Sequence, residues 1–296
     1  MELRGKNEDL DHDEHRGFLP LTPDTFRIPN SPSICLRYNI FFPKGIAVTK
    51  AFTQRIDPAL GNEQLAGADP ARIVKWATEH FDQTVAMTSS FGAQSAVMLH
   101  LVTRAIPDIP VILIDTGFLF PETYRFVETL TEKLKLNLKV YQSPISPARM
   151  VALHGQMWEQ GKEGLDRYHR MRKVEPLREA FEQLKVTAWL AGLRRDQTHY
   201  RRSLSIVDVQ DGITKILPLL DWSRRQMHAY LAEHGLPYHP LHEKGYVSLG
   251  DWHTTRPLTP QDTHERQTRF QGLKQECGIH LPQTEQENES RGSSNL

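Results

Sequence analysis

One stretch of the sequence decides the fold: Thr84-Val85-Ala86-Met87-Thr88-Ser89-Ser90-Phe91-Gly92-Ala93-Gln94-Ser95-Ala96-Val97-Met98-Leu99-His100-Leu101. A short apolar run leads into a Ser/Gly loop, and a segment with helical periodicity follows at once. This order predicts a strand, a tight loop and a helix, whose free N–H groups can hold phosphate or sulfate. The loop lacks the G-x-x-x-x-G-K-[ST] and G-x-G-x-x-G patterns. Taken alone, it is a weak signal, because such a loop is more often the start of a serine-capped helix after a buried strand that binds nothing.

Further apolar runs extend this unit into a sheet. We predict strands at 111–114, 136–141, 187–191 and 213–217, and helices from Pro70, from Pro121 to 134, from 172 and from 223 to 234. Alternation of strands and helices predicts an α/β fold with a doubly wound, mostly parallel sheet. Ligands of such sheets bind beyond the carboxyl ends of the strands. The loop at 89–92 and Asp115-Thr116-Gly117 both lie at that edge and can face one ligand.

Basic side chains gather near the same edge and toward the C-terminus. Four arginines follow the strand at 187–191 within nine residues, namely Arg194, Arg195, Arg201 and Arg202. Such a cluster can clamp phosphate or sulfate with paired N–H groups, although a solvated basic loop is an equal alternative. The glycine-rich run at 243–256 has no period and predicts a functional loop. We predict a charged helix containing Arg266 and Arg269 after it.

Composition limits the classes of function. Lys plus Arg and Asp plus Glu both number 36, so the whole protein offers no field for nucleic acid or anionic lipid. No apolar run approaches the roughly 20 residues that span a bilayer, and the first residues lack the pattern of a secretory signal. We therefore expect a cytoplasmic protein. The expected organisation is a disordered extension at 1–56, a nucleotide-binding domain at 57–240, a catalytic segment at 241–280 and a disordered tail at 281–296.

The chain has two cysteines, Cys35 and Cys277. In the cytoplasm both are expected to be free thiols. An iron–sulfur cluster needs about four cysteine ligands, and no Cys/His pair has zinc spacing, so we expect neither a cluster nor a metal. Cys277 lies beside a glycine near the C-terminus, three residues before His280, which favours a reactive nucleophile over a packing role.

These motifs together resemble the 3′-phosphoadenylyl sulfate reductases of assimilatory sulfate reduction, in the adenine-nucleotide alpha-hydrolase-like group. The resemblance covers residues 71 to 280. It rests on these stretches, in order: Ser89 to Val97, Asp115 to Tyr124, Lys173 to Pro176, Gly192 to Arg195, Gly245 to Arg256, and Glu276-Cys277-Gly278-Ile279-His280. The first of them is similar to the family's modified pyrophosphate loop.

The resemblance implies a mechanism. The Cys277 thiolate attacks the sulfate sulfur of 3′-phosphoadenylyl sulfate, adenosine 3′,5′-bisphosphate leaves, and thioredoxin or glutaredoxin then releases sulfite from the S-sulfonated cysteine. No bound cofactor is implied. The expected substrate-binding residues are Ser89, Ser90, Phe91, Gly92, Ser95, Asp115, Thr116, Gly117, Lys173, Arg195, Arg201, Arg266, Arg269 and His280. The oligomeric state stays open, with a homodimer as one option.

One departure affects the substrate. Many relatives have Ser-Gly-Ser-Arg where this chain has Thr198-His199-Tyr200-Arg201. Arg201 is kept, but the bulk of His199 and Tyr200 weakens the expectation of a 3′-phosphate contact. The alternatives are a cluster-free reductase of adenylyl sulfate, an ATP-pyrophosphate-cleaving ligase, which needs no terminal cysteine, and a nucleotide-binding module without activity, which needs neither Cys277 nor the arginines.

Overall fold

The computed structural model of the chain describes residues 56–81 and 84–282, all within one unit, Gln54–Leu296. Expectations for residues 1–55 and 283–296, Cys35 among them, lie outside the described residues. The unit is built on a six-stranded sheet with the strand order β3-β2-β1-β4-β6-β5. Its strands are β1 (Val85–Thr88), β2 (Pro110–Ile114), β3 (Asn137–Tyr141), β4 (Ala188–Ala191), β5 (Val207–Gln210) and β6 (Ile213–Ile216).

The strand pairing confirms the expected α/β class. Every neighbouring pair is parallel except β5 and β6, which form an antiparallel hairpin at one edge. All four residues of β4 are buried, as are the first three of β1. Burial on both faces of a parallel sheet explains why these strands read as continuous apolar runs.

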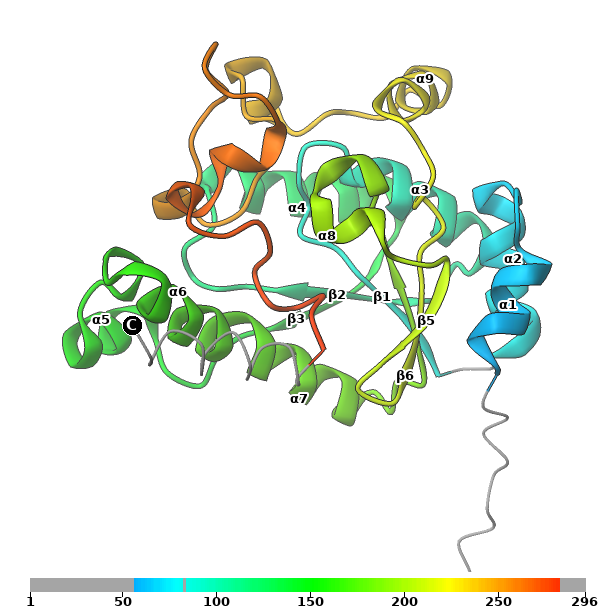
Figure 1. Cartoon of the computed structure of the whole chain (residues 1–296), viewed down its shortest axis with the longest axis horizontal. Coiled ribbons are helices and arrows are strands. Elements are labelled where there is room, and N and C mark those ends of the chain that lie inside the picture. Colours follow the sequence, from blue (N-terminus) through cyan, green and yellow to red (C-terminus); the bar gives the residue numbers. More distant parts are fainter. Residues whose placement is uncertain (1–55, 82–83, 283–296) are drawn as a thin grey trace, which may run out of the picture. The chain divides into compact units, whose positions relative to one another are not determined.

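Helices cover both faces of this sheet (Figure 1). α3 and α4 lie on one face, and α6 and α7 lie on the other. The α-helices are α1 (Pro58–Gln64), α2 (Pro70–His80), α3 (Ser95–Ala105), α4 (Pro121–Leu134), α5 (Pro147–His154), α6 (Gly161–His169), α7 (Glu175–Gln183), α8 (His199–Arg202) and α9 (Arg224–Glu233). The shorter helical turns are η1 (Met157–Glu159), η2 (Arg170–Val174), η3 (Arg195–Gln197), η4 (Pro240–Lys244), η5 (Trp252–Thr254), η6 (Glu265–Thr268) and η7 (Phe270–Gly272).

The strand order places a crevice between β1 and β4. The chain runs from β1 through β2 to β3 on one side and then returns to pair β4 with the other side of β1. The parallel register aligns Thr88 with both Ile112 and Ala191, so the loops after these strands leave the sheet at one edge. Ligands of open α/β sheets bind at such a switch in strand order.

Most predicted elements are present, and several segments had not been predicted. The expected helix after Asp69 is α2, whose first turn is capped by the Asp69 carboxylate accepting from the Arg72 N–H at 2.9 Å. α1, α6, α8 and β5 had no prediction, and α5 had only the suggestion of a short helix.

The predicted charged helix around Arg266 and Arg269 is wrong. Two short 3-10 turns, η6 and η7, stand there instead, and Arg269 between them has extended backbone. Phe270 and Gln271 then adopt positive φ values of 53° and 55°, which an α-helix cannot contain. The polar contacts of the two arginines, described below, account for this irregular path.

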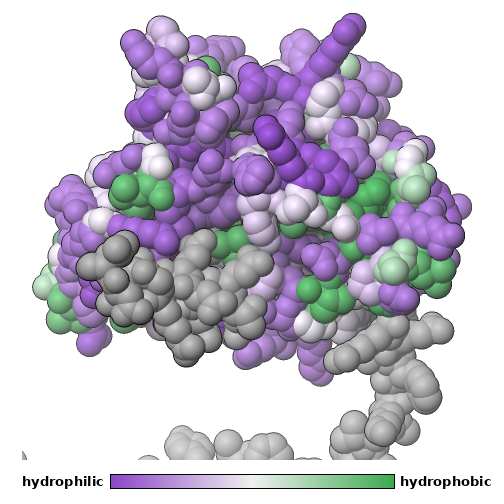
Figure 2. All heavy atoms as spheres, viewed as in Figure 1, coloured by the Kyte–Doolittle hydropathy of each residue, from purple (hydrophilic) through white to green (hydrophobic). Residues whose placement is uncertain are grey.

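Figure 2 shows that hydrophilic residues predominate on the face drawn there, with apolar residues in small separate groups. Within the described ranges, no helix is both long enough and apolar enough to cross a membrane.

Candidate active site

A cavity of about 250 Å³ opens at the carboxyl edge of the sheet, between the loops that follow β1 and β4. It brings together most of the predicted site residues. Those that line it are Ser89, Ser90, Gly92, Ser95, Thr116, Lys173, Arg201, Arg266, Arg269, Cys277 and His280. Phe91, Asp115, Gly117 and Arg195 do not line it. The cavity therefore joins residues of the sheet edge to residues of the C-terminal segment.

The loop after β1 is held in a fixed conformation. Phe91 has a positive φ of 47°, and its fully buried ring anchors this unusual backbone in the core. The Phe91 N–H donates to Ser89 Oγ at 3.1 Å, and the Ser95 N–H donates to the Gly92 carbonyl at 3.1 Å. The buried Ser95 Oγ at the start of α3 has no hydrogen-bond partner among the described residues. This hydroxyl and the start of α3 can receive an anion.

Asp115 and Gly117 shape the loop after β2 instead of lining the cavity. The Asp115 carboxylate accepts hydrogen bonds from the Gly117 N–H, Tyr124 OH and Gln142 Nε2 at 2.6–2.8 Å. Gly117 has a φ of +74°, and a Cβ there would lie 2.4 Å from Pro147. This loop requires glycine both for its conformation and for space.

A buried ion pair sits beside this loop. Lys173 Nζ lies 2.6 Å from Asp251 Oδ2, and Thr116 Oγ1 donates to Asp251 Oδ1 at 2.5 Å. Burial opposes ionisation of Asp251, but the Lys173 ammonium and the bonds from Lys173 and Thr116 prevail and hold its pKa well below the usual range. Asp251 thus holds the Lys173 side chain in place at the cavity wall.

Arg194, and not Arg195, faces the cavity. Arg194 is buried, and its guanidinium donates to Gln94 Oε1 at 3.2 Å, tying the loop after β4 to the loop after β1. Arg195 instead pairs with Asp221 at 2.5 Å and donates to the carbonyl groups of Arg202 and Leu204. Of the two, Arg194 can touch a ligand and Arg195 supports the loop.

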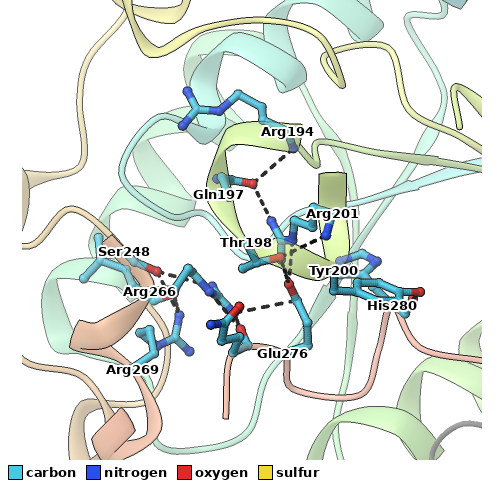
Figure 3. A network of polar contacts seen from close by, with 12 residues as sticks. Arg194, Gln197, Thr198, Tyr200, Arg201, Ser248, Arg266, Arg269, Glu276 and His280 are labelled. Atoms are coloured by element: carbon cyan, nitrogen blue, oxygen red, sulfur yellow. Dashed lines mark hydrogen bonds and ion pairs between the residues drawn. The ribbon is translucent and has the colours of Figure 1, made fainter. Parts of the chain in front are cut away.

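Arg201 joins the sheet edge to the C-terminal segment (Figure 3). Its Nε and Nη2 atoms donate to the two carboxylate oxygens of Glu276, each at 2.7 Å, and Thr198 Oγ1 donates to Glu276 Oε1 at 2.9 Å. Burial opposes ionisation of Glu276, but Arg201 and Arg266 prevail and lower its pKa. The paired N–H donors form the bidentate geometry that arginine makes with carboxylates. The residue before Cys277 is therefore tied to α8.

Arg266 and Arg269 converge on Ser248 from the C-terminal segment (Figure 3). The Nη1 atom of each donates to Ser248 Oγ, at 3.3 Å and 3.4 Å. Arg269 also donates to the Leu249 carbonyl at 2.6 Å, and its buried Nε has no hydrogen-bond partner in the described chain. A Cβ on Gly250 would lie 1.9 Å from Arg269 Nη2, so Gly250 provides the space for this guanidinium.

Cys277 is partly buried and lines the cavity with these arginines. Burial and repulsion from Arg201 and Arg269 lower the pKa of Arg266 to about 9, while Glu276 and Cys277 act in the opposite direction. Arg266 is thus protonated at neutral pH, and it shares the cavity wall with Cys277. The His280 ring stacks on Trp189 with centroids 5.1 Å apart, and burial together with Lys215 and nearby arginines holds its pKa well below the usual value. His280 is therefore neutral at neutral pH.

The charge of the cavity wall favours an anionic ligand. Five basic side chains line it, namely Lys173, Arg194, Arg201, Arg266 and Arg269, against two acidic ones, Asp251 and Glu265. A buried excess of guanidinium and ammonium groups binds a crowded anion and stabilises charge that develops during reaction. With a cysteine in the same wall, the site can carry out nucleophilic attack on an anionic electrophile.

Sequence reasoning placed Arg194 in the basic cluster but chose its neighbour Arg195 as the substrate-binding residue. It assigned no individual role to Ser248, Asp251 or Glu276, which lie within the motifs that carry the family resemblance. In described residues 56–81 and 84–282, no group of three or more His, Cys, Asp or Glu side chains could hold a metal ion.

Comparison with known proteins gives a consistent result. The family model described as "Phosphoadenosine phosphosulfate reductase domain" matches residues 84–257. A phosphoadenosine 5′-phosphosulfate reductase of Synechocystis sp. is 54% identical over 240 residues, covering 81% of this chain and 96% of the relative. One of Synechococcus sp. is 56% identical over 221 residues, covering 74% and 95%. The crystal structure of a phosphoadenylyl-sulfate reductase from Candida auris, a phosphate complex, has a TM-score of 0.59 and 31% identity, covering 67% of this chain and 96% of that one.

Proposed function

The chain belongs to the phosphoadenosine phosphosulfate reductase family, as its motifs predicted, and we propose that it reduces 3′-phosphoadenylyl sulfate to sulfite through an S-sulfonated Cys277. The observation that carries the proposal is that Cys277 lines the same cavity as the loop after β1 and five basic side chains. The reaction supplies sulfite for assimilatory sulfate reduction.

The first step transfers a sulfonate group. The Cys277 Sγ atom, as a thiolate, forms a bond to the sulfate sulfur, and the bond between that sulfur and the bridging oxygen of the phosphosulfate breaks. The leaving oxygen keeps the electron pair, so adenosine 3′,5′-bisphosphate departs with an added negative charge. Lys173 and the cavity arginines are the groups that can neutralise this charge.

The second step needs a dithiol reductant, and thioredoxin or glutaredoxin fills this role. One thiolate of the reductant attacks Cys277 Sγ, sulfite leaves with the electron pair, and a mixed disulfide forms. The second thiol of the reductant displaces Cys277 and closes its own disulfide. Sulfur(VI) is thereby reduced to sulfur(IV), and the dithiol is oxidised. We place the reaction in the cytoplasm, where such dithiols are kept reduced.

Several side chains of the cavity have atoms that can bind the nucleotide. Ser95 Oγ and Arg269 Nε have no hydrogen-bond partner within residues 56–81 and 84–282, so the first can donate to a phosphate at the start of α3 and the second to the sulfate end. Arg201 is the candidate for the 3′-phosphate, and Glu276 already holds it in place. Tyr200, the bulky residue in the departure noted above, donates from its hydroxyl to the His280 carbonyl at 3.2 Å and so fixes the C-terminal segment.

A sulfite-release assay with 3′-phosphoadenylyl sulfate and adenylyl sulfate in parallel tests the proposal. With reduced thioredoxin, we expect sulfite from the first substrate with the higher kcat/KM. A higher kcat/KM with adenylyl sulfate would make the chain a cluster-free adenylyl-sulfate reductase. Absence of sulfite from both substrates would refute the reductase function.

A further inference from the structure

We infer that the β5–β6 hairpin positions the nucleophile, through Gln210 and Lys215, which hold the backbone that follows Cys277. This inference rests on the proposed function of Cys277. Neither hairpin residue lines the cavity, so neither belongs to the binding machinery described above.

Three consecutive carbonyl groups after Cys277 accept hydrogen bonds from this pair. Gln210 Nε2 donates to the carbonyls of Ile279 at 2.9 Å and Leu281 at 3.2 Å. Lys215 Nζ donates to the carbonyl between them, that of His280, at 3.2 Å. These residues belong to no helix or strand whose backbone could bond their carbonyl groups, so side chains do so: the two hairpin residues bond all three carbonyls, and the Tyr200 hydroxyl also donates to that of His280.

The two hairpin side chains also hold each other. Lys215 Nζ donates to Gln210 Oε1 at 2.7 Å, which fixes the amide with its N–H groups toward the C-terminal segment. Lys215 is 2% exposed and lies 4.9 Å from the centre of the Trp189 ring, on which His280 stacks. Its oxygen partners are uncharged, and burial, the largest cause, lowers its pKa to about 8. Burial of an ammonium group whose partners are uncharged costs folding free energy. Its retention is explained if Lys215 serves to hold these carbonyl groups.

The hairpin therefore fixes the far side of Cys277, while Glu276 fixes the near side. Glu276 is tied to Arg201 and Thr198, and the carbonyl of Gln275 accepts from Arg266 Nε at 2.9 Å. The nucleophile lies between two anchored pieces of irregular backbone. Reactivity falls steeply when a nucleophile is displaced by about 1 Å, so loosening either anchor should slow the attack.

The test uses the full chain with two variants and a matched control. In Gln210→Glu, the new carboxylate still accepts from Lys215 but presents no N–H to the Ile279 and Leu281 carbonyls. Lys215→Met keeps the length of the side chain and removes its donor. Val209→Thr, on the half-exposed face of β5, controls for substitution in the hairpin.

Single-turnover formation of the Cys277 adduct is measured by mass, and binding of adenosine 3′,5′-bisphosphate by calorimetry. We expect both variants to form the adduct at least about tenfold more slowly, as loss of two buried hydrogen bonds predicts. Their bisphosphate Kd should stay within about twofold of the parent value, since a positioning effect acts on the chemical step. An unchanged adduct rate, or a rate loss matched by weaker binding or by a similar loss in Val209→Thr, would overturn the inference.

Hydrogen exchange separates this inference from the proposed function. In the ligand-free protein, Gln210→Glu should speed exchange of the amides at 276–282, and Val209→Thr should not. If the parent forms no adduct at all, the proposed function fails, yet the exchange result still reports whether the hairpin anchors the segment. Unchanged exchange in Gln210→Glu would refute the anchoring itself.

Discussion

Glu276→Gln is the substitution that tests most directly how Cys277 is placed. The Glu276 side chain is 5% exposed, and both of its oxygens accept from Arg201 at 2.7 Å. Glutamine has the same shape, but one oxygen becomes an NH₂ group that faces the guanidinium donors. At least one charge-assisted hydrogen bond is lost, which is worth about 1.5–3 kcal/mol, or roughly a ten- to hundredfold change in an equilibrium or rate.

We expect this loss in the chemical step. Formation of the Cys277 adduct in a single turnover without thioredoxin should slow by about ten- to hundredfold. Bisphosphate binding should change much less, because two effects oppose each other. Removal of the buried negative charge strengthens the attraction of the cavity for the anion, whereas Arg201, held by fewer hydrogen bonds, is oriented less firmly toward it. Glu243→Gln, which changes the net charge by the same amount at an exposed residue of η4, is the matched control. An adduct rate equal to that of the control, or a deficit confined to binding, would refute the reasoning.

Three further predictions concern the nucleophile, the arginine cluster and the pH dependence of stability. Cys277→Ser should bind the bisphosphate and release no sulfite, since a hydroxyl does not ionise at neutral pH, whereas Cys35→Ser should keep parental activity; a mass increase of about 80 Da on the Cys277 peptide checks the intermediate. Gly250→Ala should displace the Arg269 guanidinium and slow adduct formation without a large change in Tm, and parental kinetics would show that Arg269 needs no such space. Burial lowers the pKa of His239 to about 4, so between pH 6.5 and 4 the unfolded chain takes up a proton that the folded chain excludes, and the free energy of unfolding falls as pH falls. In denaturant titrations of His239→Gln, the free energy of unfolding should fall less between pH 6.5 and 4 than it does in the parent. A fall equal to that of the parent would show that other groups cause it.

The fold was predictable because its central strands carry strong local signals. β1, β2 and β4 are buried on both faces, so each reads as a continuous apolar run. β5 has two exposed residues between two buried ones and gains its place only by pairing with β6. α1 is seven residues long and depends on contacts such as Asn62 Nδ2 donating to the Val207 carbonyl at 2.7 Å. Elements stabilised by distant contacts leave little trace in the local pattern.

The candidate site was predictable in kind and less so in detail. Strand ends identify which loops reach the edge, and this brought Ser89 and Arg201 to one cavity. The position of a strand end does not indicate which of two adjacent arginines faces the cavity. Arg195 faces away from it because Asp221 and neighbouring carbonyl groups bind its guanidinium. Partners such as Asp251 and Glu276 are visible only once residues distant in sequence are brought together.

We propose that Arg201 links recognition of the nucleotide to placement of the nucleophile. Its guanidinium lines the cavity, and its Nε and Nη2 atoms grip Glu276. Adjacent Cα atoms lie about 3.8 Å apart, so a shift of the Glu276 carboxylate is transmitted to Cys277 by a single peptide unit. On this proposal, an anion that draws Arg201 toward the cavity pulls on the segment that carries the thiol. If the group expected to bind the 3′-phosphate also positions the attacking sulfur, a substrate that lacks this phosphate should react more slowly even when it binds.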